Sequence, residues 1–246
     1  MKLLIDIGNT RLKWALWDGK SLQAQNALAH GAGDNVDFAS LFKDIPKPET
    51  AFVASVAAPA LDEVLAQVLR SLFGIQPVFV RSSAKACGVC NAYAQPERLG
   101  VDRFLGLIAV HAQGHAPAVV ASCGTALTLD ALAVDGTHLG GLIAPAPDLM
   151  RSALLGNTAR LGSIDAAHIV EVADNTADAV ASGTWLAAAS LIERFVRHAV
   201  SRFGVAPHLI IGGGGAAQLG ALLTLTHRID RELVLRGLAY YAEQAP

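Results

Sequence analysis

The feature that most constrains the fold is a strand–turn–strand unit that occurs twice in the 246 residues. Each copy has an apolar run, a short polar segment with glycine, a second apolar run and an Asp-Gly pair; the copies span residues 1–20 and 116–138. Asp-Gly between apolar runs is typical of a hairpin turn. Glycine in the polar segment lets a ligand approach the backbone. The repeat predicts two hairpins that could hold a nucleotide phosphate chain between them.

The rest of the chain predicts an α/β protein with two similar domains, residues 1–115 and 116–246, and a cleft between them. Residues 21–50 read as mostly loop, with room for one strand. The apolar spacing and the turn residues predict helices over 59–73, 96–113, 178–203 and 231–243, and strands over 2–7, 12–17, 51–56, 77–81, 118–122, 126–134, 138–143 and 208–211.

Charge and hydropathy limit the kinds of partner that the chain is expected to bind. The chain is 52% hydrophobic and 16% charged, which is enough to bury a sizeable core, and its net charge is −2. Without a basic run, a nucleic-acid surface is not expected. No apolar run reaches the roughly 20 residues that cross a bilayer. The N-terminus enters directly as a strand, which argues against a signal peptide and favours the cytoplasm.

We call residues 6–10 (DIGNT) the first glycine loop. Asp6 ends an apolar strand, where a carboxylate loses hydration unless it is paired, hydrogen-bonded or bound to a metal. It could hold Mg²⁺ directly or through water, while the loop donates to phosphate oxygens; the alternative is a residue that caps the turn. Lys13 on the return strand could offset phosphoryl charge, or could simply be solvated.

The segment Gly100-Val101-Asp102-Arg103 lies near the start of a predicted helix. Asp102 could take a proton from a substrate hydroxyl, and Arg103 could bind a substrate carboxylate in bidentate fashion. The alternative is that Asp102 caps the helix.

We call residues 122–126 (SCGTA) the second glycine loop. Thr125 could donate to a phosphate, whereas Cys123 has no identified base and is interpreted as a packing residue. The run at 212–215 (GGGG) offers either a flat backbone against a nucleotide or a flexible turn. Cys87 and Cys90 form a lone CxxC, which lacks the second pair that a zinc site needs and is interpreted as loop packing.

Several of these segments, in this order, resemble motifs of the type III pantothenate kinase family, a member of the acetate and sugar kinase, heat-shock ATPase and actin superfamily. DIGNTRLKWA at 6–15 resembles the first phosphate motif, and GVDR at 100–103 the substrate and catalytic motif. SCGTALTLD at 122–130, GGLIAP at 140–145 and NTADAVASG at 175–183 are similar to three further motifs. The resemblance covers essentially the whole chain.

The resemblance implies a duplicated ribonuclease-H-like fold, a homodimer, and transfer of the γ-phosphoryl group of ATP to the 4′-hydroxyl of pantothenate, the first step of coenzyme A synthesis. Asp102 would be the general base, and Asp6 would hold Mg²⁺. The residues that would contact ATP are Asp6, Ile7, Gly8, Asn9, Thr10, Arg11, Leu12, Lys13 and Thr125. Those that would bind pantothenate are Tyr93, Gly100, Val101, Asp102, Arg103 and, from the neighbouring subunit, Thr176.

Two departures from the family pattern stand out. Ser122 replaces an Asp that is associated with a bound K⁺ or NH₄⁺, so we expect the monovalent cation to be needed weakly or not at all. Ala146 replaces a Gly, which would strain the backbone by about 1 kcal/mol if φ there is positive. The rival functions are a non-catalytic nucleotide-binding regulator on the same fold and a kinase for a sugar or acetate. The presence of Asp6, Lys13, Asp102 and Arg103 favours an enzyme over the regulator.

Overall fold

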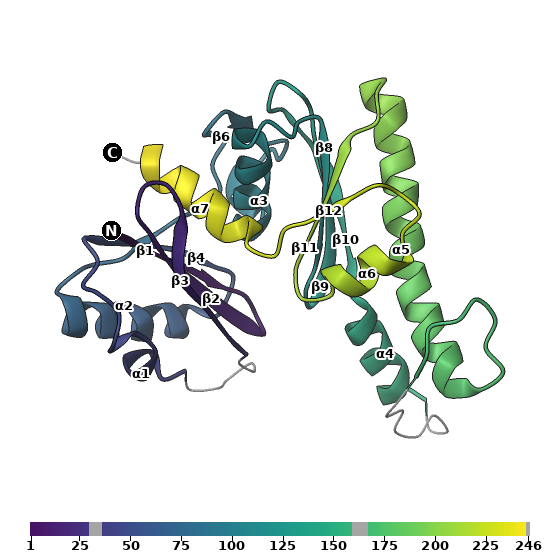
Figure 1. Ribbon diagram of the computed structural model, residues 1–246, viewed down its shortest axis with the longest axis horizontal. Coiled ribbons are helices and arrows are strands. Elements are labelled where there is room, and N and C mark those ends of the chain that lie inside the picture. Colours follow the sequence, from purple (N-terminus) through teal and green to yellow (C-terminus); the bar gives the residue numbers. More distant parts are fainter. Residues whose placement is uncertain (30–35, 159–166, 245–246) are drawn as a thin grey trace. The chain divides into compact units, whose positions relative to one another are not determined.

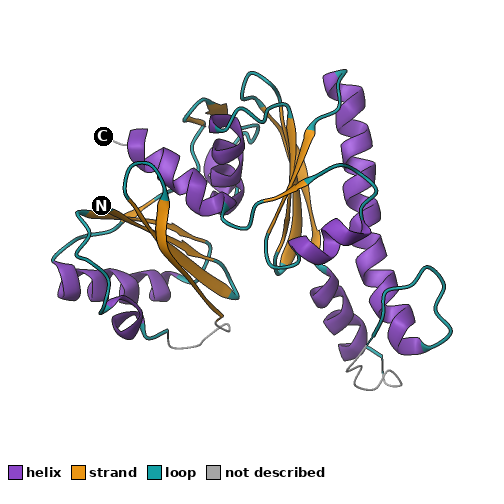
Figure 2. Ribbon diagram, viewed as in Figure 1, coloured by secondary structure: helices purple, strands orange, loops and turns teal. Residues whose placement is uncertain are grey.

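The computed structural model describes residues 1–29, 36–158 and 167–244. The chain forms two compact units, each built around a five-stranded sheet with helices (Figure 2). Unit 1 contains Met1–Gly114, Asp135–His138 and the C-terminal segment from Glu232, and unit 2 contains His115–Val134 and Leu139–Arg231. The predicted domain ranges of 1–115 and 116–246 do not include the two returns of the chain to unit 1.

The sheet of unit 1 has the strand order β3-β2-β1-β4-β5, with β1 antiparallel to β2 and parallel to β4. A separate two-stranded hairpin is formed by β6 and β7. The elements of unit 1 are β1 (Lys2–Ile7), β2 (Arg11–Trp17), β3 (Leu22–Ala29), α1 (Phe38–Phe42), β4 (Thr50–Ser55), α2 (Pro59–Phe73), β5 (Val78–Phe79), β6 (Lys85–Ala86), β7 (Val89–Cys90), the 3₁₀ turn η1 (Pro96–Arg98), α3 (Val101–Ala112) and α7 (Leu233–Gln244).

The two faces of this sheet carry different helices. Figure 1 shows α1 and α2 on one face and α7 on the other, where α7 contacts β1, β2 and β4. Because side chains alternate along a strand, Leu3, Ile5 and Ile7 of β1 enter the core with α1 and α2, and Asp6 points to the opposite face. Lys2 anchors α7 through a 2.9 Å ion pair with Glu243.

The sheet of unit 2 repeats the same arrangement, with the order β10-β9-β8-β11-β12 and with β8 antiparallel to β9 and parallel to β11. Figure 1 shows α5 and α6 against one face, where they share a core with β8, β9 and β11. The elements are β8 (Ala118–Cys123), β9 (Ala126–Leu132), β10 (His138–Pro145), α4 (Pro147–Gly156), α5 (Thr176–Phe203), β11 (His208–Gly212), α6 (Ala216–Leu222) and β12 (Arg228–Ile229).

The predicted duplication is therefore confirmed, since each unit joins a three-stranded antiparallel meander to two parallel strands. The Asp-Gly pairs lie where they were predicted, between β2 and β3 and between β9 and β10. The helix predicted within residues 96–113, with its start next to Gly100–Arg103, begins at Val101, and Pro96–Arg98 forms a separate 3₁₀ turn. Residues 21–50, predicted to be mostly loop with room for one strand, contain the strand β3 and also the short helix α1, which was not predicted.

Among the described residues, none of the helices is both long enough and apolar enough to span a membrane.

Candidate functional site

The first glycine loop joins the end of β1 to the start of β2, next to the last pair of their antiparallel ladder. The N–H of Gly8 donates to the carbonyl of Arg11 at 2.9 Å, so it is used inside the loop. A Cβ at Gly8 would lie 3.2 Å from that carbonyl oxygen, which explains the glycine. Asn9, Thr10 and Arg11 are exposed, so their polar groups can reach a phosphate from solvent.

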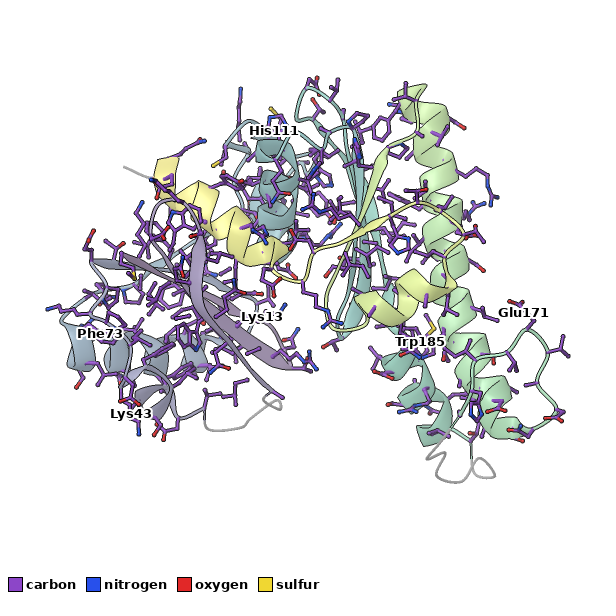
Figure 3. The ribbon with its side chains drawn as sticks, in the orientation of Figure 1. Lys13, Lys43, Phe73, His111, Glu171 and Trp185 are labelled. Atoms are coloured by element: carbon purple, nitrogen blue, oxygen red, sulfur yellow. The ribbon has the colours of Figure 1, made fainter. Side chains whose placement is uncertain are left out.

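The predicted ATP-binding residues on the two strands beside the loop lie on opposite faces of the sheet. Ile7 and Leu12 are opposite each other in the ladder, and both side chains are fully buried in the core. Only their backbone can take part in binding. Asp6 and Lys13 are also opposite each other, on the other face, and both are partly buried. Figure 3 shows Lys13 on β2.

The carboxyl of Asp6 has a strongly perturbed pKa, raised from 3.8 to about 7. Removal from water is the largest cause, repulsion from Asp102 is the second, and Lys13 acts in the opposite direction. A cation beside two carboxylates relieves both the lost hydration and the repulsion. The environment of Asp6 therefore fits Mg²⁺, which binds in proteins through one or two carboxylates together with substrate phosphates.

The start of α3 places Asp102 without making it the helix cap. Gly100 is the N-cap and makes no side-chain cap bond. Asp102 lies in the first turn of the helix and is therefore not its N-cap residue, so the alternative that it caps the helix is wrong. The N–H of Arg103 donates to Asp102 Oδ1 at 2.9 Å. A Cβ at Gly100 would lie 2.6 Å from the same oxygen, so the glycine makes room for the carboxylate.

Arg103 is buried, with 7% of its surface exposed, and it reaches the predicted substrate residue Tyr93. Its Nη1 donates to the Tyr93 hydroxyl at 3.1 Å, and the guanidinium carbon lies 5.9 Å from the centre of the ring. Val101 is buried at the first position of α3. The structure thus brings Tyr93 together with the start of α3, as the resemblance implies for a substrate pocket.

His138, for which no sequence motif predicts a role, stacks on Tyr93 with 6.1 Å between ring centres and 18° between ring planes. It is 1% exposed. The available signal was a histidine at the start of an apolar strand directly after an Asp-Gly turn.

The second glycine loop lies in unit 2, between β8 and β9. The N–H of Gly124 donates to the carbonyl of Ala126 at 2.9 Å. This bond closes the second loop as the Gly8 bond closes the first, but it joins residues two apart in the sequence instead of three. Thr125 is exposed, and its carbonyl accepts from the N–H of Ala146 at 3.3 Å. Ser122 is opposite Thr128 in the β8–β9 ladder, so the two side chains share a face.

The glycine run at 212–215 packs against this loop. A Cβ at Gly213 would lie 2.2 Å from the carbonyl oxygen of Cys123, and one at Gly215 would lie 2.6 Å from its Sγ. Gly213 also has a φ of +85°. Cys123 is buried in the core, which raises the pKa of its thiol to about 11. It is a packing residue, as expected, and the run is a tightly packed backbone segment.

Thr176 is the first residue of α5, and its side chain is exposed. The N-cap of this helix is Asn175, whose side chain accepts from the N–H of Asp178 at 2.9 Å. Ala146 has a φ of −73°, so no strain arises where the family has glycine. The helix α5 also carries Trp185 (Figure 3), whose ring would lie 3.4 Å from a Cβ at Gly215.

The CxxC segment forms the turn of the β6–β7 hairpin, with positive φ at Cys87 and Gly88. Across the described parts of the chain, no group of three or more His, Cys, Asp and Glu side chains is arranged to hold a metal.

Comparisons with known proteins identify the family to which the chain is similar. The family model described as type III pantothenate kinase matches residues 2–198. A type III pantothenate kinase of Xanthomonas euvesicatoria is 44% identical over 242 residues, 98% of this chain and 97% of that protein. One of Xanthomonas campestris is 45% identical over 239 residues, covering 97% and 96%.

Two solved structures share the fold at low sequence identity. A putative Baf family transcriptional activator from Campylobacter jejuni has a TM-score of 0.64 at 19% identity, and 98% of each chain is covered. A putative 2-dehydro-3-deoxygalactonokinase from Sinorhizobium meliloti has a TM-score of 0.58 at 16% identity, with both chains fully covered. These similarities indicate a fold of the actin-like ATPase and sugar kinase type.

Proposed function

The chain belongs to the type III pantothenate kinase family, and on that premise we propose that it transfers the γ-phosphoryl group of ATP to the 4′-hydroxyl of pantothenate. This reaction opens coenzyme A biosynthesis. The family implies ATP as phosphoryl donor and a divalent metal. The relatives described above are named as kinases, so a non-catalytic regulator is not favoured.

One observation carries the proposal: Asp102 and Lys13 both lie within electrostatic reach of Asp6 in unit 1. Phosphoryl transfer depends mainly on positioning and on charge stabilisation. Asp6 would hold Mg²⁺, which neutralises charge on the phosphates when it is bound. Lys13, opposite Asp6 in the ladder, is suited to stabilise the charge of the transferring group.

Asp102 would act as the general base. The 4′-hydroxyl oxygen forms a bond to the γ-phosphorus as its proton passes to the Asp102 carboxylate, and the bond from the γ-phosphorus to the bridging oxygen breaks, so that ADP leaves. The neighbouring Arg103, which is buried against Tyr93, would pair with the substrate carboxylate. Tyr93, Gly100 and Val101 would line the rest of the pocket.

Unit 2 would contribute further contacts. Thr125 is exposed on the second glycine loop and would donate to ATP. In a homodimer, Thr176 would contact the pantothenate held by the other subunit, a role supported by its exposure at the start of α5. ATP and pantothenate would be drawn from the cytoplasm.

The residue Ser122 bears on the monovalent cation. Its neutral hydroxyl is a weaker ligand than a carboxylate for K⁺ or NH₄⁺, so activity should depend weakly on either ion. A titration with potassium chloride against tetramethylammonium chloride at constant ionic strength tests this expectation. Steep activation by potassium in the unaltered protein would contradict it.

The proposed function itself is tested by ADP release from the purified chain with ATP and Mg²⁺. Pantothenate should support turnover, whereas acetate and glucose should not. ATP binding without turnover on any of the three acceptors would favour the regulator instead.

A further inference from the structure

The turn between β9 and β10 lies beside β7 and continues its hydrogen bonding. The N–H of Cys90 donates to the carbonyl of Gly136 at 2.9 Å, and Cys90 forms a parallel bridge with Thr137. One step further along a parallel ladder, the N–H of Ala92 would donate to the carbonyl of His138. The structure differs at this step.

The N–H of Ala92 donates instead to the imidazole Nδ1 of His138, over a long 3.4 Å hydrogen bond. The side chain thus takes the place of the backbone carbonyl at the point where the backbone of His138 enters β10.

The same imidazole supports the next residue of the loop. Its ring stacks on Tyr93, 6.1 Å from centre to centre, and Arg103 binds the Tyr93 hydroxyl at 3.1 Å. The N–H of Tyr93 donates to Asn91 Oδ1 at 3.0 Å. Tyr93 is therefore held by His138 at its ring, by Arg103 at its hydroxyl and by Asn91 at its backbone.

We propose that His138 is a positioning residue for substrate binding: it fixes the Ala92–Tyr93 segment so that Tyr93 and Arg103 present a preformed pocket to an acceptor that carries a carboxylate. This inference rests on the proposed function, because the pocket is the one assigned there to pantothenate. His138 acts through Tyr93 and takes no part in the transfer of the phosphoryl group.

Two substitutions separate the contributions of the imidazole. His138→Leu removes both the acceptor and the stacking ring, whereas His138→Asn keeps an oxygen near the place of Nδ1. We expect the pantothenate KM to rise at least ~10-fold in His138→Leu, with kcat and the ATP KM within about twofold, since binding of one substrate is weakened equally in the ground state and the transition state. His138→Asn should recover part of the loss.

A matched control is His227→Asn, which alters a half-buried histidine of unit 2 that bonds a backbone carbonyl, that of Leu225, at 2.8 Å. It should leave both KM values unchanged. A fall of kcat without a rise of the pantothenate KM in His138→Leu would overturn the positioning role. An unchanged pantothenate KM in a folded variant would also overturn it.

Hydrogen exchange at the Ala92 amide tests the anchoring step without any substrate. We expect protection in the unaltered protein and faster exchange in His138→Leu, with recovery in His138→Asn. An unprotected Ala92 amide in the unaltered protein would overturn the inference even if no variant folds. If the unaltered protein turned over no pantothenate, the proposed function would fail, whereas normal turnover with an unchanged KM in His138→Leu would overturn only this inference.

Discussion

At the scale of single residues, Asp102 has the sharpest expected effect. Asp102→Asn keeps the size of the side chain and the oxygen that accepts from the N–H of Arg103, but it removes the base. We expect kcat to fall at least ~100-fold, within the range for loss of a general base, while ATP still binds. Steady-state kinetics and calorimetric ATP titration measure the two effects. Near-normal turnover would reduce Asp102 to a structural residue.

Asp6 makes metal binding dependent on pH. Its pKa of about 7 means that the carboxyl is half protonated near neutral pH without metal, so binding of Mg²⁺ with a nucleotide should release a proton. Calorimetry at pH 7 in buffers of different ionisation enthalpy measures that release. Asp6→Asn should bind the magnesium nucleotide more weakly and should release no proton from this site. Equal proton release by the variant would contradict the assignment.

The same pKa has a consequence for stability, whose sign follows from linkage. The unfolded chain loses this proton near pH 3.8, whereas the folded chain keeps it up to about pH 7, so folding becomes less favourable as pH rises between these values. Without metal, Asp6→Asn should therefore melt at a higher temperature than the unaltered protein at pH 8. The gain should shrink towards pH 5, as melting curves in a metal chelator would show. A gain that is constant with pH would rule out titration of Asp6 as its cause.

At the scale of elements, one close contact holds α7 to α3. A Cβ at Gly237 would lie 2.0 Å from the carbonyl oxygen of Leu105, so Gly237→Ala should lower the free energy of unfolding by about 1–3 kcal/mol through overpacking. The control is Gly183→Ala in α5, where nothing lies within 4 Å of the added atom. That change should stabilise the helix by up to about 1 kcal/mol. Denaturant unfolding compares the two, and equal effects would contradict the packing argument.

The elements also show what the sequence could and could not predict. The hairpins were predictable because their apolar runs and Asp-Gly turns are local signals. The strand β3 was not, because seven of its eight residues are exposed and its side chains give no apolar alternation. The placement of α7 depends on Gly237, whose partner Leu105 is far away in the sequence, and no local pattern reports such a contact. For the site, the motif residues could be identified from the sequence. The role of His138 could not, because it depends on the pairing of the β9–β10 turn with β7.

At the scale of the whole molecule, the proposed homodimer, in which Thr176 would contact the substrate of the other subunit, would allow complementation. Asp102→Asn and Thr176→Ala should each be weakly active, but after subunit exchange a mixed dimer contains one intact site. An equal mixture should recover about a quarter of normal activity, because half of the dimers are mixed and one of their two sites is intact.

The control for this experiment mixes Asp102→Asn with Tyr93→Ala. Both residues would then serve the same subunit's site, so no mixed dimer would contain an intact one and no recovery is expected. Recovery in both mixtures, or in neither, would contradict the crossed role of Thr176.

The two sheets share one strand order, so each position in one sheet has a counterpart in the other. Asp6 and Ser122 are such a pair, because each is the fifth residue of the first strand of its sheet. This position carries an acid in unit 1 and a neutral hydroxyl in unit 2. Ser122→Asp would make the two positions alike and would add to unit 2 a negative charge that a bound cation could balance.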